Sequence, residues 1–269
     1  HGGIRSDITI ATIDDELIQV GANGHTDYTY LSKEAQHQSK QNPSRWVQVR
    51  DITGATCSIG LWGPRAANVM RAVNSEDFSS VASPHFQVKK TNIAGIPVTV
   101  IPVTPLGAPG WEIHASADSG QVVWDALWKA GQSQGVVAAG GIAYKALRME
   151  NGRRAWGTDM TTEHDPFEAG VEFAIDTRKQ GFVGEAALAG RSKKSAKRRL
   201  RCLTVNDGRS VVLGKEPVFY NGRAVGYVTS AAFGYTIGKP IAFTYLPSSV
   251  GVGDQVEIEY FGRIIPATV

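Results

Sequence analysis

The sequence predicts an α+β fold in which a region of mixed helices and strands is followed by a small antiparallel β domain. Of its 269 residues, 42% are hydrophobic and 20% are charged, which is typical of a globular chain with one large domain or two smaller ones. Helix and strand patterns alternate up to about Leu188, whereas only strand patterns follow the basic run from Arg191 to Arg201. We therefore place one domain at residues 1–190 and a second at residues 191–269.

Residues 4–73 predict a hairpin, two helices and two further strands. β-Branched residues are frequent in 4–13, acidic residues follow at 14–16 and an apolar pattern returns at 17–22, so we expect a hairpin with Asp7 in its first strand. Apolar residues at helical spacing predict a helix that starts near residue 27 and ends before residue 41. Strands are expected at 46–51 and 56–61. The pair Gly63 and Pro64 favours a helix over residues 66–73, because proline is tolerated in a first turn.

The next segment predicts strands at 86–90 and 98–103, joined by a turn at 94–97. Residues 110–113 alternate, so Trp111 and Ile113 share one face of a strand and Glu112 takes the other. A helix that ends at Gly131 has an apolar face formed by Val123, Trp124, Leu127 and Trp128.

A further short helix is predicted from residue 142 to a stop at Gly152, packed through Ala143 and Leu147. Arg148 and Glu150 cannot share a helix face, so at least one of these charges points into a cleft or at a neighbour. A helix end with ordinary solvated charges is the alternative.

The C-terminal region begins with seven basic residues among the eleven of the run from Arg191 to Arg201. Strand patterns follow at 200–205, 218–220, 224–230, 241–245, 256–260 and 264–269. Asn221-Gly222 and Phe261-Gly262 supply turn residues between some of these strands, so we expect a small antiparallel barrel or sandwich.

Composition and residue spacing exclude several classes of function. The net charge of +3 is too small to indicate nucleic acid or a membrane as the main partner, and no apolar run approaches the roughly 20 residues of a spanning helix. The six histidines and two cysteines show no metal-ligand spacing, and no dinucleotide-binding glycine motif follows a strand. We expect a cytoplasmic protein, or one of an organelle matrix, with reduced thiols, no metal site and no flavin site of its own.

Several motifs occur here in the order found in one family. They are Leu147-Arg148-Met149-Glu150, Gly157-x-Asp159, Pro166-x-Glu168-Ala169-Gly170 and Phe182-x-Gly184-x-x-Ala187-Leu188. The chain resembles the aminomethyltransferase family, which includes the glycine-cleavage T-protein, and is most similar to the folate-binding C-terminal half of dimethylglycine and sarcosine oxidases and dehydrogenases. The resemblance covers essentially the whole chain and implies a folate-binding domain followed by a β-barrel. It also implies an N-terminally truncated first domain, because the Gly2-Gly3 segment lies well inside that domain in the family.

The resemblance assigns the catalytic position to Asp7. It implies that this carboxylate orients tetrahydrofolate and manages the proton as the N5 amine attacks a one-carbon unit. A carboxylate in an otherwise apolar strand must face a polar cleft or solvent, because burying an unpaired charge is costly. A solvated edge-strand aspartate is the alternative.

Four further residues are candidates for folate binding. A pterin edge presents a ring N–H beside an exocyclic amine, which the carboxylate of Glu112 can accept with two hydrogen bonds. Arg148 would orient that carboxylate or hold the ligand directly. Phe173 is expected either to stack on the ligand or to pack in the core. Asn23 resembles an asparagine of the family's site.

Two segments qualify this assignment. Relatives carry a tyrosine and an acidic residue where this chain has Pro105, Leu106, Gly107, Ala108 and Pro109, which puts catalytic efficiency in doubt. The basic run from Arg191 is expected to be a solvated linker, with a polyglutamylated folate tail as an alternative partner.

The resemblance implies transfer of a one-carbon unit to tetrahydrofolate, giving 5,10-methylenetetrahydrofolate. The unit would come from an N-methyl amine oxidised by a flavin domain, with FAD on a missing domain or a partner chain. Two alternatives stay open: a free-standing aminomethyltransferase of the T-protein type, and a folate-binding module without turnover.

Overall fold

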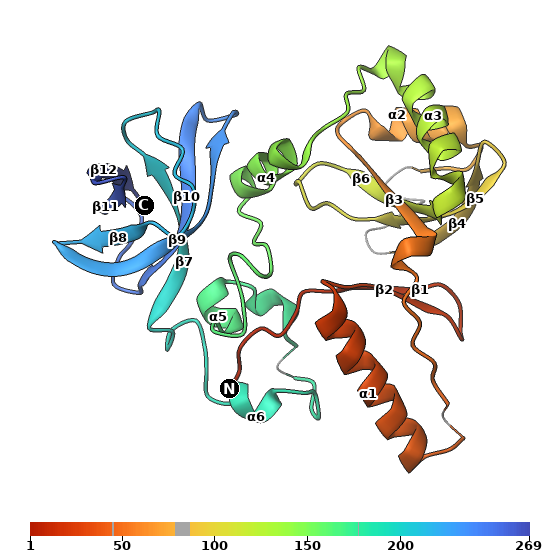
Figure 1. Ribbon diagram of the computed structural model, residues 1–269, viewed down its shortest axis with the longest axis horizontal. Coiled ribbons are helices and arrows are strands. Elements are labelled where there is room, and N and C mark those ends of the chain that lie inside the picture. The colour runs from red at the N-terminus through yellow and green to blue at the C-terminus, as the bar shows by residue number, and fades with distance from the viewer. Residues whose placement is uncertain (45, 79–86, 177) are drawn as a thin grey trace. The chain divides into compact units, whose positions relative to one another are not determined.

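The computed structural model describes residues 1–44, 46–78, 87–176 and 178–269 (Figure 1). The chain forms two compact units, which we call the sheet unit (Ile8–Ala139) and the barrel unit (His1–Asp7 with Gly140–Val269). This division differs from the expected boundary after residue 190, because residues 140–190 and the first seven residues pack with the C-terminal barrel.

The sheet unit is built on a four-stranded antiparallel sheet in the order β3-β6-β5-β4. Helices α2 and α3 cover one face of it (Figure 1). Met70, Val123 and Leu127 of these helices pack with Ile113 of the sheet. The strands are β3 (Thr56–Trp62), β4 (Lys89–Ile93), β5 (Ile96–Pro102) and β6 (Gly110–Ser116), and the helices are α2 (Ala66–Val73) and α3 (Gly120–Gly131). Short 3₁₀ turns lie at Thr53–Ala55, Ala117–Ser119 and Gln132–Gln134.

A hairpin lies on the opposite face of this sheet. It consists of β1 (Thr9–Thr12) and β2 (Ile18–Gly21), and Ala11 packs against Ile101 and Val103. Helix α1 (His25–Gln41) follows, and of its residues only Asp27 is buried. The sheet therefore has an apolar face beneath the helices and a more polar face beneath the hairpin.

The barrel unit contains a closed antiparallel barrel in the order β10-β7-β12-β11-β8-β9, as the alternating C-terminal pattern predicted. Its interior is filled by residues such as Leu203, Val228, Leu246 and Ile258. The strands are β7 (Arg198–Val205), β8 (Pro217–Tyr220), β9 (Arg223–Gly234), β10 (Lys239–Pro247), β11 (Gln255–Tyr260) and β12 (Arg263–Thr268). Helices α5 (Pro166–Ala169) and α6 (Glu185–Leu188) precede these strands, with a 3₁₀ turn (Glu172–Ala174) between them.

Helix α4 (Gly141–Glu150) packs against β9, but not through the predicted face. Ala146 and Met149 are buried against Ile241 and Phe243, whereas Ala143 and Leu147 are exposed. The prediction was wrong because the helix also buries the charged side chain of Arg148, which an apolar period cannot reveal.

Two predicted strands are corrected by the structure. Asp7 precedes β1 and lies outside any strand: the Ile4 N–H donates to the carbonyl of His164, and Gly3 lies close to Thr162, instead of pairing with a sheet neighbour. Residues 46–51 form no strand. Of the expected strand at 86–90, Phe86 lies outside the described residues, and the observed strand begins at Lys89.

None of the described helices combines the length and the apolar character needed to span a bilayer.

Candidate functional site

Asp7 is carried by an N-terminal segment that is docked on the barrel unit. The Ile4 N–H donates to the carbonyl of His164 (2.9 Å), and the indole N–H of Trp156 donates to the carbonyl of Ile4 (3.2 Å). Gly3 lies so close to the same turn that a Cβ there would sit 1.8 Å from the carbonyl oxygen of Thr162. Only glycine fits at this position, so the path of the chain leading to Asp7 is fixed by backbone contacts.

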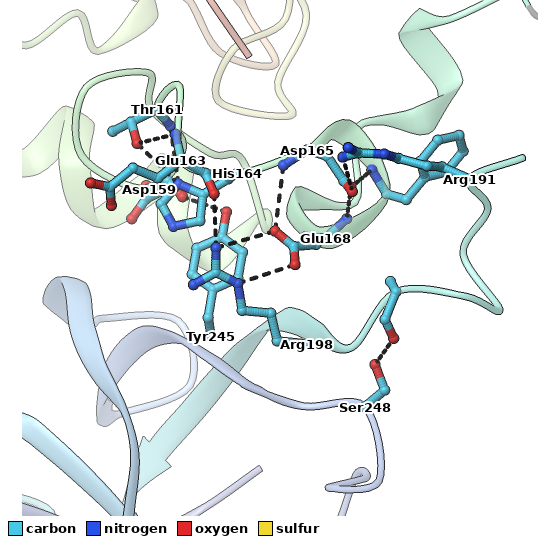
Figure 2. A network of polar contacts seen from close by, with 12 residues as sticks. Asp159, Thr161, Glu163, His164, Asp165, Glu168, Arg191, Arg198, Tyr245 and Ser248 are labelled. Carbon is cyan, nitrogen blue, oxygen red and sulfur yellow. Dashed lines mark hydrogen bonds and ion pairs between the residues drawn. The ribbon is translucent and has the colours of Figure 1, made fainter. Parts of the chain in front are cut away.

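The turn that receives this segment is held by stacked rings. The rings of His164 and Tyr245 are nearly parallel, with centroids 4.1 Å apart, as Figure 2 shows. The Thr161 N–H donates to Nδ1 of His164 (3.2 Å), so that nitrogen acts as an acceptor. Burial lowers the pKa of His164, and the nearby Arg198 lowers it further. The imidazole is therefore neutral at pH 7. Its stacking partner Tyr245 is also held in place, because its hydroxyl donates to the carbonyl of Asp159 (2.7 Å).

Charged residues surround this stack (Figure 2). Arg198 lies over the Tyr245 ring at 5.3 Å, contacts the Glu168 carboxylate (3.2 Å) and donates to the carbonyl of Glu163 (2.8 Å). Asp165 and Glu168 form a capping box at the start of α5. Arg191 pairs with Asp165 (3.2 Å). Arg191 and Arg198 are thus paired with acidic residues of their own unit, while residues 191–195 and 197 of the basic run are exposed to solvent.

Arg148 is one half of a buried ion pair. It is 7% exposed and donates to the carboxylate of Asp159 (2.7 Å), the carbonyl of Arg153 (2.8 Å) and the hydroxyl of Ser230 (3.0 Å). Asp159 is 0% exposed and also accepts from the Thr229 hydroxyl (2.7 Å). As predicted, a charge of α4 points at a neighbour, and these contacts tie α4 and residues 155–160 to β9. A role in folate binding for Arg148 stays a prediction.

The carboxylate of Glu112 lies in the sheet unit on the face opposite Trp111 and Ile113, as the alternation predicted. Its side chain is 33% exposed, and Oε2 lies 3.6 Å from Nε2 of His114. His114 in turn contacts the side-chain amide of Gln19 on β2 (3.3 Å). This face therefore offers an accessible carboxylate beside a second titratable group.

A shallow depression of about 310 Å³ opens beside His114 on this face. Its lining is mixed: polar residues such as Gln19, Thr56, Lys90 and His114 lie beside the apolar Ala55, Pro97, Val98 and Ala115.

The remaining candidates lie on the surface. Asn23 is exposed just before α1, where its backbone N–H donates to the Asp27 carboxylate (2.9 Å). Phe173 is 78% exposed, so its ring is not part of a core and the packing alternative is wrong. Asn23 and Glu112 belong to the sheet unit, whereas Asp7, Arg148 and Phe173 belong to the barrel unit.

Asp7 has an environment suited to proton transfer. The residue is exposed, yet the protein around it removes enough water to raise the pKa of its carboxyl group above the usual value. A carboxylate whose pKa moves toward neutrality is a more effective proton acceptor and donor at physiological pH.

Sequence reasoning missed the buried residues that support this site. His164 and Tyr245 show no motif, because they are far apart along the chain and meet only in the folded barrel unit. Asp159 belongs to the family motif Gly157-x-Asp159, but the motif does not indicate that its carboxylate pairs with Arg148. Among the described residues, no three histidine, cysteine or acidic side chains are placed to hold a metal ion.

These features define a class of protein: a two-part chain with an α+β region and a C-terminal six-stranded barrel, carrying accessible carboxylates in both compact units. Residues 1–179 match the family described as the GCVT N-terminal domain, and residues 198–269 match the glycine cleavage T-protein C-terminal barrel domain. The chain belongs to this aminomethyltransferase family.

The chain matches relatives of very different length. The chain is 37% identical over 225 residues to human mitochondrial dimethylglycine dehydrogenase, which covers 83% of this chain and 26% of the dehydrogenase. It is 29% identical to an aminomethyltransferase of Symbiobacterium thermophilum, which covers 100% of this chain and 72% of that protein. The chain thus spans about a quarter of the length of the dehydrogenase and most of the length of the transferase.

A solved structure shares the fold. The glycine cleavage system aminomethyltransferase T from Bartonella henselae matches with a TM-score of 0.76 and 22% identity, over 100% of this chain and 71% of the other. The similarity confirms the predicted fold: an aminomethyltransferase-like region followed by a small β-barrel.

Proposed function

We propose that this chain transfers a one-carbon unit to tetrahydrofolate, giving 5,10-methylenetetrahydrofolate. The donor is an N-methyl amine of the dimethylglycine or sarcosine type, oxidised to an iminium by a flavin domain or partner subunit that holds FAD. The observation that carries the donor class is the 37% identity to a dimethylglycine dehydrogenase over 83% of this chain. A cytoplasmic location belongs to the same proposal.

The residues of the chain support the chemistry in distinct roles. Glu112 accepts the paired donors of the pterin edge and so fixes the orientation of the ring. Asp7 accepts a proton as N5 and then N10 bond to the transferred carbon. The two N–H protons are lost from the folate: one leaves with the departing amine and one is released to solvent. Position and proton handling suffice, and no covalent bond to the protein is formed.

Three further residues are proposed to support ligand binding. Phe173 presents an exposed ring that can stack on the ligand, and Asn23 offers an exposed amide. Arg148 contributes through the buried network that it forms with Asp159 and Ser230.

A second candidate function rests on the coverage of the other relatives. Because the chain covers 72% of a bacterial aminomethyltransferase, a transferase that takes its carbon from a lipoyl carrier is the alternative. A folate-binding module without turnover is the third possibility, given Pro105 and Ala108 in the loop before β6.

One experiment separates these functions. Tetrahydrofolate is titrated into the chain by calorimetry, and methylene transfer is assayed with an N-methyl iminium donor and, separately, with an aminomethyl-lipoyl carrier. Saturable binding with transfer from the iminium supports the proposal, and transfer from the lipoyl carrier alone supports the alternative. Binding without transfer from either donor leaves only the module, and absence of binding contradicts all three.

A further inference from the structure

The indole of Trp62 lies on the same face of the sheet as Glu112. Gly60 of β3 is the direct cross-strand partner of Glu112, and Trp62 is the partner of Gly110. Residues two apart in a strand share a face. Trp62 and Glu112 therefore occupy adjacent positions on the polar face, while Ile59 and Leu61 pack beneath the helices on the other.

Two glycines leave the space that this ring occupies. A Cβ at Gly60 would lie 2.0 Å from Cη2 and Cζ3 of Trp62, and a Cβ at Gly110 would lie 2.6 Å from Cδ1. The ring is thus folded back along β3, over the backbone position that faces Glu112. Any side chain at Gly60 would displace it.

The orientation of the ring is fixed at its polar edge. Nε1 of Trp62 donates to the carbonyl of Val103 (3.1 Å), and the side chain remains partly exposed. The loop that follows Val103 offers no aromatic or charged side chain, since it reads Pro105, Leu106, Gly107, Ala108 and Pro109. Trp62 therefore supplies an aromatic surface beside the carboxylate where the loop supplies none.

We propose that Trp62 is the surface on which the pterin ring lies while Glu112 binds its edge, an inference that rests on the proposed folate function. A planar heterocycle gains by stacking on an indole, and its N–H donors lie in the ring plane. Direct cross-strand neighbours have Cβ atoms about 5 Å apart. A pterin ring stacked on the indole above Gly60 therefore directs its edge at Glu112, the cross-strand partner of Gly60. Trp62 thus selects planar, bicyclic ligands, and Glu112 selects those with paired donors.

The test measures the affinity of the full chain for two probes by calorimetry under anaerobic conditions. The first is 5-formyltetrahydrofolate, and the second is 6-methyltetrahydropterin, which lacks the aminobenzoylglutamate tail. Trp62→Leu is expected to weaken both about ten- to a hundredfold, the range for loss of one ring-stacking contact. Gly60→Ala, which displaces the ring without removing it, is expected to weaken both as well. Trp124→Leu on the outer face of α3 is the matched control and leaves both affinities unchanged.

A spectroscopic readout covers the case in which Trp62→Leu fails to fold. Trp62→Phe keeps an aromatic ring but loses the hydrogen bond to Val103, so it is expected to bind both probes more tightly than Trp62→Leu does. Ligand-induced quenching of tryptophan fluorescence should fall in this variant and persist in Trp124→Phe.

The outcomes distinguish the two levels of the argument. If the wild-type chain binds neither probe, the proposed folate function fails. If it binds both and Trp62→Leu is folded and binds equally well, the role of Trp62 is overturned while the folate function stands. Weakened binding of 5-formyltetrahydrofolate alone would place the indole against the tail rather than the pterin, and unchanged quenching in Trp62→Phe would remove Trp62 from the site.

Discussion

Replacing Arg148 with methionine tests the buried ion pair of the barrel unit. The substitution keeps most of the volume but leaves Asp159, which is 0% exposed, without its cation. The carboxylate would retain bonds from the Ala155 N–H (3.0 Å) and the Thr229 hydroxyl (2.7 Å). Breaking a buried pair by removing one partner costs about 3–5 kcal/mol, and the two retained bonds place the expected loss near 3 kcal/mol.

The loss of stability is measured separately for each compact unit, because the two units need not unfold together. The protection of the β9 amides from hydrogen exchange reports the stability of the barrel unit. The protection of the β3 amides reports the sheet unit and is an internal reference that should not change. The double variant Arg148→Met, Asp159→Asn removes both charges, and it should be less destabilised than the sum of the single variants by about 2 kcal/mol.

The exposed pair of Arg178 with Asp176 offers a matched control. Arg178→Met should leave exchange unchanged, since an exposed ion pair contributes little. The reasoning would be refuted if Arg148→Met lowered the stability of the barrel unit by less than about 1 kcal/mol. It would also be refuted if the effects of Arg148→Met and Asp159→Asn were strictly additive in the double variant. If that variant kept its stability but lost tetrahydrofolate binding, Arg148 would be a ligand-binding residue instead.

Three further predictions follow from the site. Glu112→Gln should weaken tetrahydrofolate binding about ten- to a hundredfold, because a charged acceptor is replaced by a neutral one; an equal affinity measured by calorimetry would remove Glu112 from the site. Burial lowers the pKa of His164 in the folded state below the unfolded value of 6.5, so the unfolded chain binds the proton more readily. The hydrogen-exchange protection of the barrel unit should therefore be greatest above pH 6.5 and fall as the pH is lowered. If a His164→Gln variant lost protection just as steeply with falling pH, groups other than His164 would be responsible. Gly3→Ala should slow methylene transfer about ten- to a hundredfold, because a Cβ 1.8 Å from the Thr162 oxygen displaces the segment carrying Asp7; transfer at the wild-type rate would mean that the docked segment does not position the carboxylate.

The C-terminal barrel could be predicted because its signals are local. Strand positions alternate, and Asn221-Gly222 and Phe261-Gly262 turn the chain with positive φ at each residue. The face on which Glu112 lies was predictable for the same reason, since strand alternation is fixed by neighbouring residues.

The errors arise where distant residues determine the local structure. Asp7 was placed in a strand because its neighbours are β-branched, yet Ile4 bonds to His164, which is 160 residues away by number. The packed face of α4 was misassigned because Arg148 is buried by Asp159 and by Ser230, which comes 82 residues later. Periodicity cannot reveal such partners. The flat placement of Trp62 likewise depends on Gly110 in another strand.

The most direct test of the proposed mechanism is the pH–rate profile of 5,10-methylenetetrahydrofolate formation in the wild-type chain and in Asp7→Asn. Because partial desolvation by the surrounding protein raises the pKa of the exposed Asp7 carboxyl group, the wild-type rate should fall as the pH is lowered through that raised value, where the base becomes protonated. Asp7→Asn should lose this acid limb and react about 10²- to 10⁴-fold more slowly, with tetrahydrofolate affinity close to wild type. Transfer at the wild-type rate with the same pH profile would contradict the account.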